Sequence, residues 1–246
     1  MPPVLRRLGA LRGWPAAVAV SSLLLAAAGI ALALDWVLTS SRRGVAYAVG
    51  GHVRSVELRI ASGSVAIRGG RPGDTRVRVG RLERYAFGRR PRERRSLAAG
   101  VLRVAERCPP VVVGHCSAAY AVTVPENVAV SVRTGEADVR LLGFHGSARI
   151  ATGAGDVTVD AFCGFHLAAA TASGRIRAIA ACAPKSLALR TVSGDATAVV
   201  PPGRYRVRAQ SATGGRRVSG VLASAAAPFR IDVRSRRGTV TVRGGL

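Results

Sequence analysis

The sequence predicts an all-β fold, a β-solenoid or domain of stacked short-strand repeats, preceded by one N-terminal transmembrane helix. Three observations support it: an uncharged apolar run near the N-terminus, a glycine-centred unit that recurs about every 20 residues, and alternating apolar residues within each unit. The expected parts are a cytoplasmic tail (1–13), a transmembrane helix acting as a signal anchor (14–36), a linker (37–52) and a β-repeat domain (53–246) with an Arg-rich and Cys-loop insertion (81–118).

The helix prediction rests on residues 14–34, which carry no charged side chain. At 1.5 Å per residue this run spans roughly 31 Å of helix, close to the ~30 Å hydrocarbon core of a bilayer. Trp14 and Trp36 flank it, where interfacial aromatic residues are typical. The basic residues before the run, which favour the cytoplasmic side, are Arg6, Arg7 and Arg12. The predicted location is therefore the bacterial cell membrane, single-pass, with the C-terminal domain outside.

Two alternatives for this segment stay open. Ala31, Leu32 and Ala33 form a small-x-small site, so the segment could instead be a signal peptide that is cleaved. Arg42 and Arg43 lie just beyond the run and would favour the inverted orientation.

A glycine marks the turn of each repeat unit. The segments ATGAGDVTVDAF from Ala151 and RTVSGDATAVVP from Arg190 share a small or polar pair, a glycine and then alternating apolar residues. Because glycine has no Cβ, it tolerates the positive φ or the close backbone approach that a corner requires. The predicted turn glycines are Gly63, Gly135, Gly155, Gly174, Gly194, Gly214 and Gly238.

Each unit contains two short strands. Val157 and Val159 alternate with polar residues after one glycine, and Leu187 and Leu189 alternate before another. Units this short cannot bury their apolar faces alone, so they must stack on their neighbours. A narrow core is expected, because its predicted positions include Ala137, Ala148, Ala169, Ala178, Ala196 and Ala198.

All four cysteines follow the apolar run, and an even number fits an oxidising compartment; the alternative is four buried thiols in a cytosolic domain. Cys163 and Cys182 are almost one repeat apart, and neighbouring strands lie about 4.8 Å apart, within the Cα range of a disulfide. Cys108 and Cys116 bracket a short loop. We predict these two pairs; crossed pairing would contradict the alignment of the coils.

The formal charge is +24, from 37 basic and 13 acidic residues. Such a field attracts polyanions, including nucleic acid, anionic lipid and acidic cell-wall polymer, and salt weakens the attraction. A codon bias toward Arg is the simpler explanation for part of the excess. Nucleic acid is not an expected partner, because only 4% of the residues are aromatic and few could stack on bases.

An arginine-rich segment, residues 81–95, is one candidate for anion binding. Its guanidinium groups could grip phosphate or carboxylate beside Tyr85 and Phe87. The alternative is a solvated, partly disordered insertion. The candidate residues are Arg81, Arg84, Arg89, Arg90, Arg92, Arg94 and Arg95.

Outward arginines of the repeats are a second candidate. Stacking could align several of them, and a bound polyanion would relieve the repulsion between like charges on neighbouring strands. A spread-out basic surface without a ligand is the alternative. These residues are Arg133, Arg149, Arg190, Arg206, Arg208, Arg230 and Arg234.

No catalytic site, metal site or cofactor is predicted. His145 and His166 each follow a phenylalanine and could stack on successive coils, but zinc needs three or four ligands. Asp156 and Asp195 would lie two coils apart with Arg175 between them, which favours a salt-bridge ladder over a pair of glycosidase acids. We find no Ser-His-Asp set and no phosphate-binding loop.

A family resemblance rests on YAVTVPENVAVSVRTGEADVRL, ATGAGDVTVDAF, TASGRIRAI and RTVSGDATAVV. These segments resemble the bacterial "putative adhesin" domain family, marked by repeated t-x-sGdv-x-v units after a v-P-x-n-v-x-v strand. The resemblance covers about Val53 to Leu246. It implies a right-handed β-solenoid-like fold, often on an envelope protein with an N-terminal transmembrane helix, and no enzymatic activity. The copy SATGGRRVSGV departs from the pattern at Arg216 and Arg217.

Together these features predict a non-enzymatic, membrane-anchored envelope protein whose basic domain binds anionic surface polymers or an envelope protein. One alternative is a sensory or regulatory ectodomain that scaffolds a membrane protein complex. Another is a polysaccharide-acting β-solenoid enzyme, whose turnover would be lost on replacement of Asp156 or Asp195.

Overall fold

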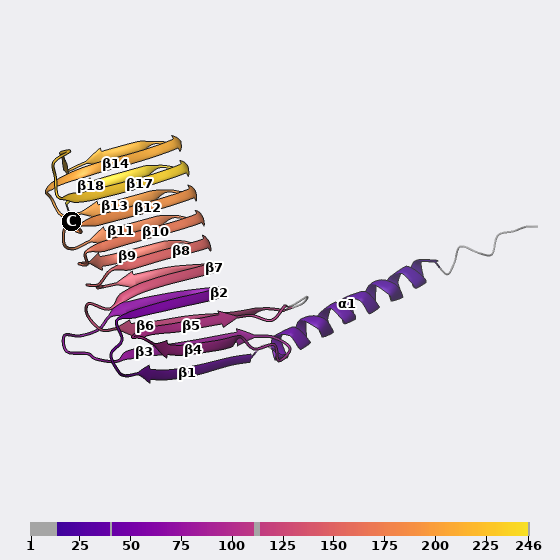
Figure 1. The fold of residues 1–246 in the computed structure, drawn as a ribbon. Helices are drawn as coiled ribbons and strands as arrows, with labels where there is room; N and C mark the ends of the chain where they lie inside the picture. Colours follow the sequence, from indigo (N-terminus) through magenta and orange to yellow (C-terminus); the bar gives the residue numbers. More distant parts are fainter. Residues whose placement is uncertain (1–13, 40, 111–113, 246) are drawn as a thin grey trace, which may run out of the picture.

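The structure, a computed structural model, describes residues 14–39, 41–110 and 114–245. It contains an N-terminal helix, α1 (Trp14–Thr39), followed by 18 strands in one continuous curled sheet (Figure 1). The all-β, solenoid-like fold predicted from the repeats is therefore confirmed. The tail predicted over residues 1–13 lies outside the described residues.

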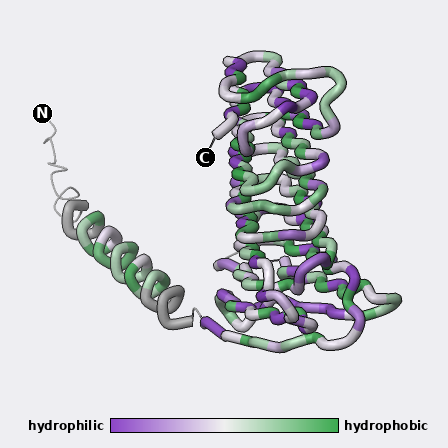
Figure 2. Tube along the Cα trace, turned by 90° about the vertical axis from the view of Figure 1, so that its left-hand side faces the viewer, coloured by the Kyte–Doolittle hydropathy of each residue, from purple (hydrophilic) through white to green (hydrophobic). Residues whose placement is uncertain are grey.

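Helix α1 projects away from one end of the β-domain (Figures 1 and 2). Every described side chain of the helix, from Val18 to Ala33, is exposed. In the described part of the chain, no helix has the length and hydropathy needed to cross a membrane. The side chains of Trp14 and Trp36 are not among those described, and the anchor stays a prediction.

Two walls of parallel strands form the body of the domain. The strands of the first wall are β8 (Ala148–Ala154), β10 (His166–Ser173), β12 (Ser186–Ser193), β17 (Phe229–Arg237) and β14 (Arg204–Thr213). Those of the second wall are β9 (Val157–Phe162), β11 (Ile176–Ala180), β13 (Ala196–Val200), β18 (Val240–Gly244) and β15 (Arg216–Ser219). The long strands β2 (Ser55–Gly69) and β7 (Ala129–Leu142) run through both walls. Each coil thus places one strand in each wall.

The coils do not follow chain order at the C-terminal end. Strand β17 pairs with both β12 and β14, and β18 pairs with both β13 and β15. The C-terminal pair is therefore inserted between two earlier coils, and β14–β15 is the terminal coil. A short strand, β16 (Leu222–Ala223), pairs with the start of β14. This position explains the departure at Arg216 and Arg217, because a terminal coil has an exposed side and needs no buried alternation there.

The core between the walls is narrow. Apolar side chains from both walls form one cluster, and all six alanines predicted inside are buried. Hydroxyl groups then tie each coil to the next: Thr171 Oγ1 donates to the carbonyl oxygen of Gly155 (3.1 Å), and Thr191 Oγ1 donates to that of Gly174 (3.1 Å). The other members of this hydroxyl ladder are Thr152, Ser211 and Ser235. Each bond satisfies a buried polar group, which would otherwise cost stability.

Glycines form a column at one corner of the stack. Gly155, Gly174, Gly194 and Gly238 have φ values between +131° and +146°. A Cβ on Gly174 would lie 2.1 Å from the carbonyl oxygen of Gly155, so the corner excludes side chains as well as favouring glycine. Gly63 has φ +128°, with a Cβ position 2.1 Å from the Ala118 carbonyl oxygen, and Gly214 extends the column on the terminal coil.

Gly135 does not lie in this column. It lies beside Gly153, and Ala137 occupies the corner next to Gly155. Strand β7 passes through the corner without a positive φ, so that coil needs no glycine there. Gly135 is spaced from Gly155 like the other glycines in the sequence, but strand register does not place it in the column.

The end of the stack beside α1 combines one last coil, which pairs in parallel with β2, with strands that pair antiparallel. Its strands are β1 (Ser41–Val49), β3 (Val77–Tyr85), β4 (Arg92–Ala98), β5 (Val101–Arg107) and β6 (Cys116–Val124). Strand β5 extends the first wall and carries β4, whereas β6 extends the second wall and carries β3 and then β1. Most of the predicted linker, 37–52, is therefore strand, because Val45, Tyr47 and Val49 alternate along β1.

Candidate functional site

The candidate arginines of segment 81–95 do not form one patch. Arg81 points between the walls, with Nη1 2.9 Å from Glu93 Oε2 and Nη2 2.5 Å from Glu83 Oε1. Arg95 lies over the ring of Tyr47, with its guanidinium carbon 4.5 Å from the ring centroid. Arg90 lies similarly over Tyr85, and Arg89 donates to the Pro110 carbonyl oxygen. The segment forms the end of β3, a turn and β4, and its exposed arginines include Arg84, Arg92 and Arg94.

Around Arg81 lies a buried polar group that we name the base cluster, which comprises Arg81, Glu83, Glu93, Glu106, Tyr47 and Tyr120. The hydroxyls of Tyr47 and Tyr120 each donate to Glu93 at 3.0 Å. Glu106 accepts from the backbone N–H of Ala61 at 3.0 Å, and burial raises the pKa of its carboxyl. The three carboxylates outnumber the guanidinium that they surround, so Arg81 has no charge left for an external anion.

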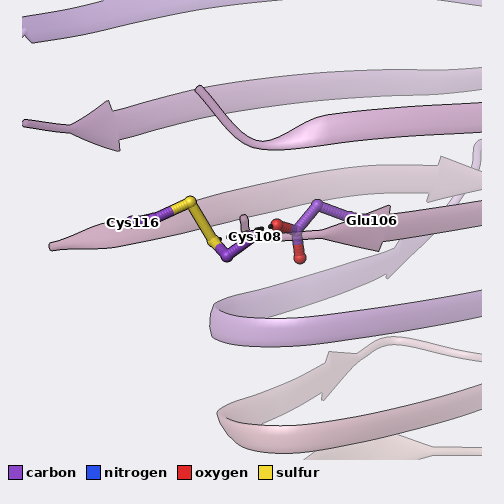
Figure 3. Close-up of side chains that lie close together, drawn as sticks. All are labelled: Glu106, Cys108 and Cys116. Atoms are coloured by element: carbon purple, nitrogen blue, oxygen red, sulfur yellow. Dashed lines mark hydrogen bonds between the residues drawn. A yellow bond between two sulfur atoms is a disulfide. The ribbon is translucent and has the colours of Figure 1, made fainter. Parts of the chain in front are cut away.

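Both predicted disulfides are confirmed. Cys163 and Cys182 join adjacent coils with a Cα–Cα distance of 4.7 Å, and Cys108 and Cys116 close their loop at 5.8 Å. Glu106 lies beside the second pair, and these three residues are the one close group of metal-ligating types in the described part of the chain (Figure 3). Their sulfur atoms are bonded to each other and so cannot act as thiolate ligands.

The outer surface of the first wall, which we name the basic face, concentrates arginine. Strand register brings like charges onto neighbouring strands in three pairs: Arg59 with Arg133, Arg190 with Arg234, and Arg206 with Arg230. Asp232 partly neutralises one pair, at 2.8 Å from Arg234 and 3.7 Å from Arg190. Further outward arginines of this face include Arg149 and Arg208. The predicted arginine ladder therefore exists but is interrupted. On successive strands Ala151 and Ala170 stand between Arg133 and Arg190.

A hollow of about 440 Å³ lies beside the interruption, two residues nearer the start of each strand. Small side chains create it, since Ala168 and Ala188 stand where neighbouring strands carry charged residues. Arg149 and His166 line it, and His166 Nδ1 is 2.8 Å from Ser186 Oγ. Sequence reasoning missed this hollow, because alanines on an outward row give no signal until the strands are aligned.

The two histidines do not stack. Phe144 is buried and packs on Phe162, with ring centroids 6.5 Å apart, whereas Phe165 is 66% exposed. The expected parallel between the Phe-His pairs is therefore wrong. His166 aligns with Ser147, one residue before the Ala148–Leu167 partners, and not with His145.

The acidic residues at the corner of the second wall act as structural acceptors. Asp156 pairs with Arg175, whose Nη2 lies 2.7 Å away, and accepts the backbone N–H of Arg175 at 2.8 Å. These hydrogen bonds lower the pKa of Asp156. Asp195 accepts the backbone N–H of Thr239 on the inserted strand at 2.7 Å. A carboxyl that is held ionised cannot supply the proton that a glycosidase acid must donate.

Comparison with known proteins identifies similar folds. The family model described as Toastrack DUF4097 matches residues 119–242. The crystal structure of a "putative cell adhesion protein" from Clostridium sporogenes aligns with 83% of this chain and 100% of its own, at 8% identity and a TM-score of 0.52. A "putative adhesin" from Bacteroides fragilis aligns with 83% of this chain and 98% of its own, at 9% identity and a TM-score of 0.46. No curated protein matches the chain.

Proposed function

The chain belongs to the Toastrack DUF4097 family, and we propose that it is a non-enzymatic envelope protein whose basic face attaches to an anionic polymer of the cell surface. The solved structures that it resembles carry adhesion names, which agrees with a binding role. The lowered pKa of Asp156 argues against acid catalysis at the corner where carboxylates gather.

One observation carries the proposal: register places arginines side by side on the basic face. Neighbouring strands lie about 4.8 Å apart, and like charges at that distance destabilise a sheet. A polyanion lying across the strands would replace repulsion with attraction in all three pairs. The Arg-rich segment contributes less, because Arg81 is neutralised and the guanidinium groups of Arg90 and Arg95 lie over tyrosine rings.

We further propose that α1 anchors the domain to the bacterial membrane. The large apolar side chains that it exposes are Val18, Val20, Leu23, Leu24, Leu25, Ile30 and Leu32. Exposing such a surface to water costs free energy, and its transfer into lipid is favourable. Fractionation of cells that express the full chain tests this step, since a protein released by high salt alone would contradict it.

The binding proposal is tested by retention of the full-length protein on purified bacterial cell wall at low and high salt. Replacing one member of each pair, in Arg133→Ser/Arg190→Ser/Arg230→Ser, should abolish retention at low salt. The matched control, Arg140→Ser/Arg177→Ser/Arg217→Ser, removes the same charge from the outer surface of the second wall. Equal loss in both variants would indicate attraction to net charge alone and would contradict a binding face.

A further inference from the structure

The hollow in the basic face differs chemically from the arginine pairs beside it. Its lining combines the methyl groups of Ala168 and Ala188 with the hydroxyls of Ser131 and Ser147. A volume of about 440 Å³ is within the range of small-molecule sites. A surface that bound a polyanion through separate charges alone would need no such concavity.

Arg149 is the ionic group available in the hollow. It is exposed and, among the residues that the structure describes, makes no ion pair. Glu57, the acidic residue of the lining, is already paired with Arg103 at 3.3 Å. The guanidinium of Arg149 can therefore offer both arms of its fork to a carboxylate.

We propose that this hollow binds one acidic sugar unit of a surface polysaccharide. The Arg149 guanidinium holds the sugar carboxylate, His166 and the serine hydroxyls exchange hydrogen bonds with ring hydroxyls, and Ala168 and Ala188 contact the apolar face of the ring. This inference rests on the proposed function and narrows its ligand from polyanions in general to an acidic polysaccharide.

The surroundings favour a polymer with spaced charges. Arg149 is the one cation of the hollow's described lining, so a densely charged phosphate chain would leave most of its charges unmatched there. None of the described residues that line the hollow is Phe, Tyr or Trp, so the large aromatic rings on which bases stack are missing there. The Arg59–Arg133 and Arg190–Arg234 pairs lie in the next outward row of the same wall, two residues further along the strands, so a chain bound in the hollow lies beside both pairs.

The test uses the full-length protein and a fluorescent hyaluronan hexasaccharide, in which acidic and neutral sugars alternate. Arg149→Gln should weaken binding about tenfold, because it removes a charge-assisted pair of hydrogen bonds. The control Arg133→Gln removes the same charge outside the hollow and should weaken binding by less than about threefold. Ala188→Leu fills the hollow from an outward position and should abolish sugar binding while leaving polyphosphate binding intact.

Three results would overturn the sugar site and leave the wider proposal standing. The first is an equal effect of Arg149→Gln and Arg133→Gln on the hexasaccharide, and the second is an unchanged affinity for its carboxyl-reduced form. The third is binding of polyphosphate without binding of the hexasaccharide. If hexasaccharide, polyphosphate and cell wall all fail to bind, the proposed function itself fails.

Discussion

The coil stack and the base of the domain both pack two walls against each other, but the interior is apolar in the stack and charged at the base. Between the coils the interior is apolar, and its few polar groups are hydroxyls, which donate to a backbone carbonyl of a neighbouring coil except at Thr134. At the base, three carboxylates surround Arg81, and Glu83 and Glu106 are only 3% and 2% exposed.

This difference arises because the coils of the stack resemble one another, whereas the strands of the base do not recur. Most coils have a similar neighbour, so a glycine corner and a hydroxyl bond recur from coil to coil, with the β7 coil as the exception. Beyond β5 and β6 the base has no next coil, and the antiparallel strands β1, β3 and β4 continue the walls there. Buried ion pairs contribute little net stability but penalise any arrangement that separates their partners, so we expect the base cluster to favour this end over continued stacking.

The largest effect is expected at the corner of the stack. In Gly174→Ala the new Cβ would lie 2.1 Å from the Gly155 carbonyl oxygen at φ +146°, so the backbone of two coils must move. We expect a loss of about 4 kcal/mol in unfolding free energy, measured by urea unfolding followed by circular dichroism. Gly73→Ala is the control, because Gly73 also has positive φ but nothing within 4 Å of its Cβ position, and should cost about 1 kcal/mol.

Removing the cation of the base should have the next largest effect. Arg81→Leu leaves Glu83 and Glu93 buried without a counter-charge and should cost about 3 kcal/mol. Arg84→Leu, on the exposed side of the same strand, should change the unfolding free energy by less than about 0.5 kcal/mol. Similar losses in both variants would show that the cluster does not depend on its cation.

The two regions should respond to pH with opposite signs. Burial raises the folded-state pKa of Glu106, so its contribution to stability is complete below the ordinary carboxyl pKa and is lost as pH rises through the raised value. Hydrogen bonds from Arg175 lower the pKa of Asp156, whose contribution is present above the ordinary value and is lost as pH falls.

Single neutral replacements separate these effects. Glu106→Gln should stabilise the protein by about 1 kcal/mol at neutral pH and have no effect below about pH 4. Asp156→Asn should cost about 0.5 kcal/mol or less at neutral pH, because its pair is exposed, and nothing in acid. Urea unfolding across this pH range measures both, and a pH-independent difference would contradict the titration of the group concerned.

The smallest effect compares two members of one row of the sheet. Thr191→Val removes the hydrogen bond to Gly174 and should cost about 1 kcal/mol. Thr134 occupies the same row, but its buried Oγ1 has no hydrogen-bond partner, so Thr134→Val should be neutral or slightly stabilising. Equal costs at both positions would mean that packing around the methyl groups, and not the hydroxyl bond, holds the ladder.

What the sequence revealed was the part of the molecule that repeats. The pairing of Cys163 with Cys182 followed from a spacing of almost one coil, and the buried alanines followed from alternation. The same logic failed for Gly135 because β7 turns its corner without positive φ. It failed for Phe165 because the buried partner of Phe144 comes from the preceding strand, at Phe162.

Features made by non-repeating contacts were invisible in the sequence. The base cluster joins Tyr47 to Glu93 and Arg81 across separate strands, and no local pattern marks such partners. The hollow depends on Ala168 and Ala188 lying side by side, which requires the register. The insertion of β17–β18 also breaks chain order, which a count of repeats assumes.

That insertion has a consequence for how the protein is made. The wall strands of the terminal coil, β14 and β15, pair with β17 and β18, so the far tip closes only after these later strands have been made. A protein fused to the C-terminus would leave from the side of the molecule beside β18, and it could obstruct the closing step even if it folds well itself (Figure 1).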